Sequence, residues 1–452
     1  MNHGFNKVKD RCDSAFVTVF YRFLPALWIL APVALAYANA LPAAFQFDDF
    51  NVIVENPVVH SLQAWRADAL QGIRPLLKLT YALNWRMSPG PAGFHLVNVL
   101  IHAANALLVH RLASRRLGPG PGSFLAALVF ALHPVQTEAV TYVSGRSVSL
   151  MATGCLLSME SREWPRAGRV LSPAFFLAAL LVRETALVLP VALLLWDRLG
   201  GRSWKEGLRR IRVHAGLVAI ALLMPLAHEG YGRFFSASLG LRSVALNLLT
   251  QVEALGYLAS RVVLPWGLNI DPDLRPVQSV DAWHLAGGVL ILALACAALA
   301  RFRPDRPGWA FGTLWFLLIL LPTNSIFPRR DVVSERHLYL ALFGFCLAVG
   351  HLADRAAARF QLSRTLAGAL TLAFAGILGA ATLARNRAYA TEISLWEDTA
   401  RKSPEKARVH NNLGYAYQLA GRYPDARRAY LRALTLDPGH ARARANLERL
   451  PP

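Results

Sequence analysis

The chain has 452 residues, 54% of them hydrophobic, and a formal net charge of +20 at pH 7. This length exceeds one ordinary soluble domain, and the mean hydropathy of +0.34 is high for a globular protein. The four cysteines lie in the N-terminal segment or in apolar stretches, which argues against a disulfide framework and favours reduced thiols. They are Cys12, Cys155, Cys296 and Cys346.

Apolar stretches separated by short charged loops recur along the chain, and several approach the ~20 residues that cross a bilayer as a helix. They lie at 23–41, 94–112, 124–140, 215–226, 285–299, 309–321, 338–352 and 366–383. This pattern predicts an all-α, polytopic transmembrane bundle with about eleven crossings. The first stretch leads into a long loop and shows no cleavage site, so we expect a signal anchor that stays in the protein.

The positive charge has a topological explanation, which argues against nucleic-acid binding. The N-terminal segment and alternate loops near 111–116, 162–169, 198–212, 301–306 and 355–364 carry 22 lysines and arginines, whereas the longer intervening loops carry 13. This bias predicts a cytoplasmic N terminus. An odd number of crossings then places the C-terminal segment outside the cytoplasm, and we expect a bacterial inner-membrane protein.

Two outer loops are longer than connectors need to be. The first, 42–93, contains Asp48 and Asp49 among phenylalanines, followed by an apolar-patterned segment near 76–83 that predicts a short helix on the membrane surface. The second, 228–283, includes an amphipathic segment at 241–264. The sequence leaves open whether that segment crosses the membrane or lies flat on it.

The C-terminal segment 385–452 carries a tetratricopeptide-type repeat. With Ala407 as position one, seven signature positions of the 34-residue unit are filled by Leu413, Gly414, Tyr417, Ala426, Tyr430, Ala433 and Pro438. Trp396 and Pro404 fit a partial unit before it, and a third begins at Ala441. One full repeat cannot bury its own apolar face. We therefore expect this module to lean on the membrane domain, 1–384, or on a partner.

Ionisable residues gather at the ends of apolar stretches on the outer side. A pair such as Asp48 and Asp49 is most simply a solvated loop or a helix cap, but neighbouring carboxylates can also supply a base. Charged groups at membrane depth are costly and usually face a cavity or one another. The further candidates are His95, His102, His133, Glu138, Arg146, Arg183, Glu184, Glu335 and Arg336.

Several motifs resemble one known family over nearly the whole chain. They are Phe47-Asp48-Asp49, Arg74-Pro75-Leu76, the segments 94–102 and 130–140, Gly145-Arg146, Arg183-Glu184-Thr185, 335–340, Arg385-Asn386 and Trp396 with the following repeat. In this order they are similar to the transmembrane-and-tetratricopeptide-repeat protein O-mannosyltransferases and their bacterial relatives, in the glycosyltransferase C superfamily. Two departures stand out: Val148 replaces an acidic residue of the family pattern, and the repeat array is much shorter than in eukaryotic members.

The resemblance implies inverting transfer of a sugar, such as mannose, from a polyprenyl-phosphate carrier to a hydroxyl acceptor on the outer face. Asp48 is the expected general base, with Asp49 and Glu138 as further catalytic candidates. The donor phosphate needs cations, for which Arg146, Arg183, Arg336 and Lys78 are candidates. The histidines, Glu184 and Glu335 are expected around the pocket. No closed ligand set is visible, so we expect no metal cofactor.

The acceptor is open at this stage. A protein serine or threonine is expected, possibly bound through the repeat module, whereas a related transferase would modify lipid A or a polysaccharide instead. A non-enzymatic membrane scaffold that displays the module is the third alternative. Dispensable acids at the outer face would favour it.

Overall fold

The computed structural model describes residues 26–227, 229–304 and 306–451, and in these ranges all regular structure is helical. Cys12 and the expected cytoplasmic N-terminal segment lie outside the described residues. Among those described, Cys155, Cys296 and Cys346 are free thiols. The predicted all-α fold class is therefore confirmed for the described part of the chain.

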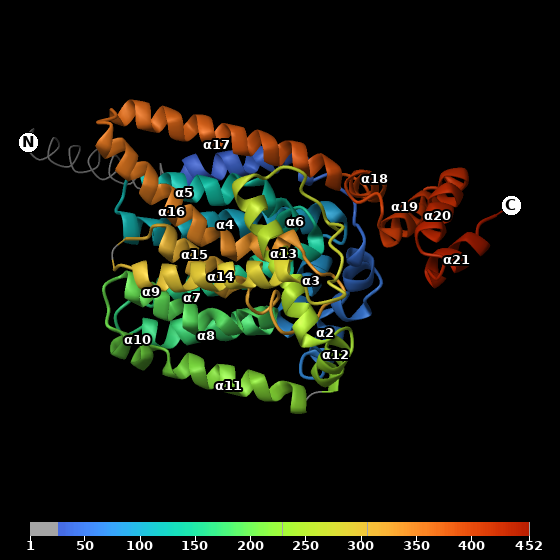
Figure 1. Ribbon diagram of the computed structural model, residues 1–452, viewed down its shortest axis with the longest axis horizontal. Coiled ribbons are helices and arrows are strands. Elements are labelled where there is room, and N and C mark those ends of the chain that lie inside the picture. The colour runs from blue at the N-terminus through green and yellow to red at the C-terminus, as the bar shows by residue number, and fades with distance from the viewer. Residues whose placement is uncertain (1–25, 228, 305, 452) are drawn as a thin grey trace, which may run out of the picture.

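The helices run roughly side by side in a bundle, with α17 along one edge, α11 along the opposite edge, and α18–α21 projecting from one end (Figure 1). Short helices of the outer loops, α2, α3 and α12, lie at the same end as α18–α21, whereas α10 lies at the other end. The membrane-domain helices are α2 (Leu62–Asp68), α3 (Pro75–Met87), α4 (Pro91–Leu117), α5 (Pro121–Leu132), α6 (Thr137–Val140), α7 (Arg146–Ser161), α8 (Gly168–Val182), α9 (Leu189–Leu199), α10 (Trp204–Arg210), α11 (Arg212–Ala227), α12 (Glu229–Leu239), α13 (Val244–Val263), α14 (Ala282–Arg301), α15 (Trp309–Leu320), α16 (Leu338–Arg359) and α17 (Arg364–Asn386).

Helix α5 is almost entirely buried and packs against α4, α16 and α17. Glycine permits its closest approach: a Cβ on Gly122 would collide with the backbone of Gly350 in α16, and a Cβ on Gly350 would collide with Gly122. Small residues at such crossings let helix backbones meet where lipid offers no hydrophobic driving force. At the far end of α5, the Thr382 hydroxyl of α17 donates to the Leu132 carbonyl at 2.7 Å.

The expected crossing at 124–140 is broken rather than continuous. Helix α5 ends before His133, and Pro134 opens a 3-10 turn (Pro134–Gln136) that leads into α6 at a bend of 45°. Proline has no N–H for the helix ladder and its ring clashes with the preceding turn. The His133 ring accepts the Val135 N–H and contacts the Val262 carbonyl at 3.0 Å, which satisfies groups exposed by the break. The bend carries Glu138 to the end of the bundle where the first loop lies.

The expected eleven crossings are not found. By length and composition, four described helices could cross a membrane, Pro91–Leu117, Ala282–Arg301, Glu335–Arg359 and Arg364–Tyr389, or five if the bent pair at 121–140 is one span. The expected stretches at 23–41, 215–226 and 309–321 contain only the short apolar helices Ala26–Ala36, Arg212–Leu223 and Trp309–Leu320, and Gly168–Val182 is a further one. Short helices can be stable inside a bundle because neighbours, rather than their own length, cover their backbones. The count of eleven included short apolar runs of this kind.

Two segments of the outer loops are helical, the open one at 241–264 and the predicted one at 76–83. The segment at 241–264 forms α13, which is not among the described helices that are long and apolar enough to cross a membrane. Its polar side chains Asn247, Thr250 and Gln251 are buried. The predicted helix at 76–83 is α3, and its Leu77 and Tyr81 are buried in the domain. One face of α3 therefore packs against the rest of the domain. Whether its other face lies on a membrane surface, as predicted, is a separate question.

The bundle end that carries α10 is held by a buried ion-pair network. Asp197, at the end of α9, is 1% exposed and pairs with Arg162 and with Arg210, the latter at 2.7 Å. Glu163 binds Arg202 at 2.9 Å beside them. The arginines of these predicted cytoplasmic loops are thus partly structural, since each buried carboxylate needs its cations nearby.

The repeat module comprises α18 (Glu392–Lys402), α19 (Ala407–Leu419), α20 (Tyr423–Leu436) and α21 (Ala441–Glu448). As expected, it leans on the membrane domain. Asn269 donates to the Ser403 hydroxyl at 2.8 Å, the Lys402 ammonium donates to the Leu268 carbonyl at 2.7 Å, and Lys406 pairs with Asp271 at 2.6 Å. Helix α17 continues through residue 385, where the sequence predicted the domain boundary. The division into domains at 384/385 stays a prediction.

Candidate active site

The two aspartates of the first loop have different surroundings. Asp49 is 1% exposed and accepts hydrogen bonds from the Gln46 N–H at 3.0 Å and from the Ser144 N–H and hydroxyl, the N–H at 2.8 Å. Burial nevertheless raises the pKa of Asp49 to about 7. Its carboxyl group binds the Gln46 N–H within the same turn and links the turn to Ser144, just before α7. Asp49 is therefore built as an anchor.

Asp48 faces a small cavity of about 20 Å³ at the same end of the bundle. Its backbone N–H donates to the Tyr142 hydroxyl at 3.0 Å. Burial raises the pKa of the Asp48 carboxyl, and the nearby Arg336 guanidinium opposes that rise. Both side chains line the cavity together with Glu138 and Asp331. A half-buried carboxylate beside a fixed cation suits proton abstraction at a site where negative charge must also be stabilised.

Glu138 positions Arg336 instead of facing the cavity freely. Its carboxylate accepts from the Ser334 hydroxyl at 2.8 Å and from the Arg336 N–H at 2.9 Å, and it lies 3.8 Å from the Arg336 Nε atom. The neighbouring Glu335 is buried, accepting from the Tyr257 hydroxyl at 2.5 Å and the Asn269 N–H at 2.9 Å. These contacts fix the short helix Glu335–His337 on both sides. Arg336 is thereby held toward the first loop.

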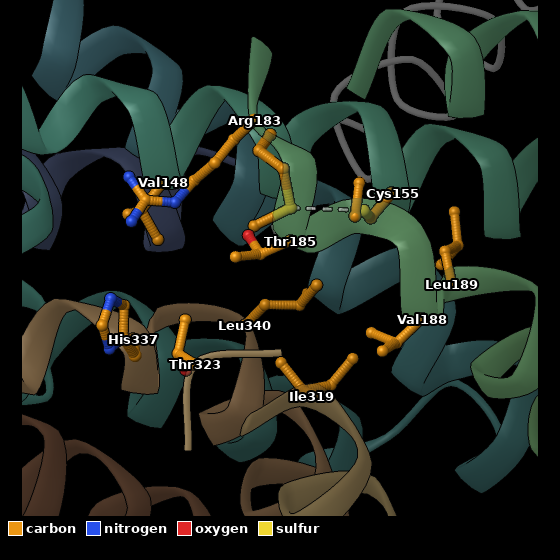
Figure 2. Close-up of a pocket in the computed structure, with 12 residues that line it drawn as sticks. Val148, Cys155, Arg183, Thr185, Val188, Leu189, Ile319, Thr323, His337 and Leu340 are labelled. Carbon is orange, nitrogen blue, oxygen red and sulfur yellow. Dashed lines mark hydrogen bonds between the residues drawn. The ribbon is translucent and has the colours of Figure 1, made fainter. Parts of the chain in front are cut away.

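A second cavity of about 20 Å³ lies between α7, α9, α15 and α16. Figure 2 shows the guanidinium of Arg183 and the ring of His337 facing one another at one end, with Leu189, Val188 and Ile319 at the other. Arg183 donates to the Ser147 hydroxyl at 2.7 Å. The polar end of this cavity is therefore cationic, and its remainder is apolar.

The cation at this end belongs to a larger group. Arg183 experiences the charges of Arg74, Arg329 and Arg336. Arg74 pairs with Glu184 through its Nε and Nη2 atoms at 2.8–3.2 Å, and Arg329 contacts the His337 ring at 3.0 Å. We name Arg74, Arg183, Arg329 and Arg336 the arginine cluster. Carboxylates also lie near the cluster: Glu184 beside Arg74, Glu138 beside Arg336, and Asp331 near Arg329. Guanidinium groups gathered in this way suit a phosphate ligand.

Two of the predicted phosphate ligands are engaged elsewhere. Arg146 is fully buried and donates to Asn98 at 2.6 Å, to Asn84 at 2.7 Å and to the Phe94 carbonyl at 3.0 Å, which joins α3, α4 and α7. Lys78 pairs with Asp68 at 2.5 Å. Neither residue lines either small cavity.

The three candidate histidines also lie away from the two cavities, where each ring contacts backbone carbonyls. His95 reaches the Ala43 carbonyl at 3.0 Å, and His102 lies between the Ala131 carbonyl and the Tyr339 hydroxyl at 2.9 and 2.8 Å. His133 supports the α5 break. No group of three His, Cys, Asp or Glu side chains is arranged to hold a metal ion within the described residues.

Sequence reasoning missed several residues of this region. Tyr142, Asp331 and Arg408 line the cavity of Asp48, and Arg329 joins the arginine cluster. The run Arg329-Arg330-Asp331 in an outer loop shortly before Glu335 was a usable signal, because charges there are costly without a purpose. Arg408 had none, since it occupies an unremarked position of the repeat.

The fold and these cavities define an all-helical membrane protein with an acid-bearing first loop, an arginine cluster and a repeat module at one end. The tetratricopeptide repeat family matches residues 407–440, as the spacing predicted. A protein O-mannosyl-transferase of Caenorhabditis elegans is 26% identical over 90% of the chain and 62% of its own length. The protein O-mannosyl-transferases TMTC3 of Mus musculus and TMTC4 of Homo sapiens are 25% and 27% identical over 93% and 86% of the chain.

These matches support the resemblance seen in the motifs: the chain is a homologue of the transmembrane-and-tetratricopeptide-repeat protein O-mannosyl-transferases. It spans 52–64% of the length of these three curated relatives. No solved structure matches the chain.

Proposed function

We propose that the chain is a membrane glycosyltransferase of the glycosyltransferase C type that moves a hexose, such as mannose, from a polyprenyl-phosphate carrier to a protein serine or threonine. The observation that carries the proposal is that Asp48 and Arg336 line one cavity, next to the other members of the arginine cluster. A base and a phosphate-binding group in adjacent positions are the two things that this transfer requires.

In the proposed reaction, the acceptor oxygen attacks the anomeric carbon while its proton passes to an Asp48 carboxylate oxygen. The bond from the anomeric carbon to the phosphate oxygen breaks, and its electron pair leaves with the polyprenyl phosphate. That phosphate gains a negative charge, which the arginine cluster offsets. Attack from the face opposite the phosphate inverts the anomeric configuration. Asp48 must be ionised at the start and is protonated at the end.

The lipid chain of the donor has a candidate place nearby. An open, largely apolar groove of about 1010 Å³ runs between α13, α14, α15 and α16. Tyr257 lines this groove and donates to Glu335, the residue before Arg336. A prenyl chain in the groove would thus begin close to the cationic site. We propose that the groove holds that chain, with the sugar phosphate at the arginine cluster.

The direct test supplies the purified full-length chain in lipid nanodiscs with polyprenyl-phosphate-mannose and a serine/threonine peptide. We expect mannosylated peptide by mass spectrometry, with the opposite anomeric configuration to the donor. Lipid A and a polysaccharide serve as rival acceptors in parallel reactions. Transfer to either of these alone would replace the protein acceptor, and failure with every polyprenyl-phosphate hexose and every acceptor would refute the enzymatic proposal.

The cellular counterpart compares envelope proteins and glycolipids with and without the gene. We expect hexose-bearing peptides that disappear when the gene is deleted and return with the wild-type chain. We propose the bacterial inner membrane as its location, with the first loop and the repeat module on the extracytoplasmic side. The charge bias of the loops supports this orientation.

A further inference from the structure

The turn that presents Asp48 is held by residues from the start of the repeat module. The Ala44 N–H donates to the Ala390 carbonyl at 3.2 Å, and the Gln46 side chain donates to the Tyr389 carbonyl. The Phe47 N–H donates to the Glu392 carboxylate at 2.8 Å. Segments more than 340 residues apart in the chain therefore lie side by side at this turn.

Phe47 adopts a backbone conformation that it would not choose alone. Its φ angle is +46°, in the left-handed region, which is disfavoured for a residue with a side chain. Such a conformation persists only where surrounding contacts impose it, and it is often found next to functional groups. Asp48 is the next residue, so the direction of its side chain depends on this turn.

Helix α18 supplies two contacts to Phe47. The rings of Phe47 and Trp396 meet edge to face, with centroids 5.1 Å apart and planes at 78°. The Trp396 indole N–H donates to one oxygen of Glu392 at 2.8 Å, while the other oxygen accepts the Phe47 N–H. The two side chains thus form one bracket around Phe47.

We propose that Glu392 and Trp396 are positioning residues, which hold Phe47 in its left-handed conformation so that Asp48 points into the cavity. The inference rests on the proposed function of Asp48 and adds a role for the repeat module. Its first helix forms part of the catalytic domain's working structure, whereas α20 and α21 are left to serve acceptor binding.

The opposite wall of the cavity is tied to the module as well. Arg408 of α19 pairs with Asp271 and, at 2.6 Å, with Asp331. Both aspartates line the cavity of Asp48. Mutation of Glu392 or Trp396 should therefore release the turn while Arg408 still holds the opposite wall of the cavity. The contribution of α18 to the turn can thus be measured separately from that of Arg408 to the wall.

Glu392→Ala is the decisive variant, and Glu397→Ala is its matched control. Both glutamates lie on α18, but Glu397 points to the other side and binds the Tyr417 hydroxyl at 2.7 Å. We expect Glu392→Ala to lower kcat for mannosyl transfer about tenfold or more without changing KM for the donor. Trp396→Ala should do the same, Glu392→Gln, which keeps one acceptor oxygen, should fall between, and Glu397→Ala should leave kcat near the wild-type value.

The pH dependence provides a readout that simple loss of folded protein would not move. Burial is the main reason that the pKa of Asp48 is raised, so a released turn should bring that pKa down toward its ordinary value. The ascending limb of kcat/KM should then shift to lower pH in Glu392→Ala. A variant that merely misfolds would scale the profile without shifting it. The charged and titratable groups around Asp48 are Asp49, Glu138, Tyr142, Asp271, Asp331, Arg336, Glu392 and Arg408.

Hydrogen exchange tests the bracket without any donor. Peptides covering residues 44–50 should exchange faster in Glu392→Ala than in the wild-type chain or in Glu397→Ala, since the Phe47 N–H loses its acceptor. Unchanged exchange would overturn the inference, whatever the enzyme does. Full kcat in Glu392→Ala, together with an inactive Asp48→Asn, would also overturn it while leaving the proposed function standing. An inactive wild-type chain with normal exchange behaviour would refute the function alone.

Discussion

Asp48 and Asp49 are adjacent in the chain, but the structure gives one carboxylate to a cavity and the other to the backbone. We expect Asp48→Asn to lower transfer about a hundredfold or more, because an amide cannot accept the acceptor proton while its shape is nearly the same. Asp49→Asn should cost less activity. The assay is mannosyl transfer by the purified chain, with Asp437→Asn on an exposed turn of the repeat module as the control. Near-full transfer by Asp48→Asn would rule out this base.

Asp49 should instead affect how the stability of the fold depends on pH. Its pKa rises from an ordinary value near 4 to about 7 in the folded chain, so the folded state holds a proton that the unfolded state has lost between these pH values. Stability therefore falls as pH rises from about 4 to about 7. The difference in thermal unfolding between wild type and Asp49→Asn should follow this slope. A difference that does not vary with pH would contradict it.

At this scale Asp48 and Asp49 were noticeable in the sequence, whereas Asp331 and several cations of the region were not. Asp48 stands out because acids flanked by phenylalanines at the end of an apolar stretch demand an explanation. Arg146 stands out for the same reason, yet its guanidinium is used up by Asn84, Asn98 and the Phe94 carbonyl. Sequence shows that a buried charge must have partners. It does not show whether those partners are a ligand or the protein itself.

Among the elements, the hairpin of α19 and α20 is the most sharply specified. A Cβ on Gly414 would lie 2.6 Å from the Tyr430 ring, and Ala426 is fully buried with Tyr430 and Leu450. The small residues expected at repeat positions eight and twenty are thus the ones that let the helices meet. These local spacings could be found from sequence because they are fixed within one supersecondary unit.

Ala426→Leu should therefore unfold the outer part of the module through overpacking, at a cost of roughly 1–3 kcal/mol. The membrane domain buries its own helices, and the bracket on α18 should survive, so donor binding and slow donor hydrolysis by water should persist. Transfer to the protein acceptor should fall. Limited proteolysis and the two activities measure this, with Ala441→Leu at an exposed position as the control.

Either of two results would revise that assignment. Equal loss of hydrolysis and transfer in Ala426→Leu would mean that the whole module supports the catalytic domain. Undiminished transfer would show that its outer helices recognise nothing needed for the reaction.

At the scale of the whole molecule, the repeat module and the loop that contains Arg202 lie at opposite ends of the bundle (Figure 1). A reporter fused to the C terminus should accordingly be active only outside the cytoplasm, and one inserted near Arg202 only inside. The cation bias of the loops sets the direction. A cytoplasmic C terminus would invert the orientation and place the proposed active site on the wrong side for the donor.

The number of crossings was the main error at this scale, and its cause is physical. Hydropathy reports how apolar a run is, but not whether lipid or protein covers it. Almost all residues of the apolar run of α5 are buried among other helices, whereas only 6% of the residues in the apolar run of α14 are buried. Contacts between distant segments, such as Phe47 with Glu392, were beyond reach for the same reason: nothing local in either segment indicates the other.

The cavity in front of Asp48 measures about 20 Å³, enough for roughly one water molecule. Under the proposed function, a hexose and a serine side chain need far more room, so the cavity would have to widen with each turnover. Widening must part contacts at the rim, where Arg408 spans Asp271 and Asp331. The closed cavity would then protect the proposed sugar donor from hydrolysis. An activated sugar held beside a closed cavity meets few water molecules, and it is exposed to attack chiefly when an acceptor has arrived to open the way.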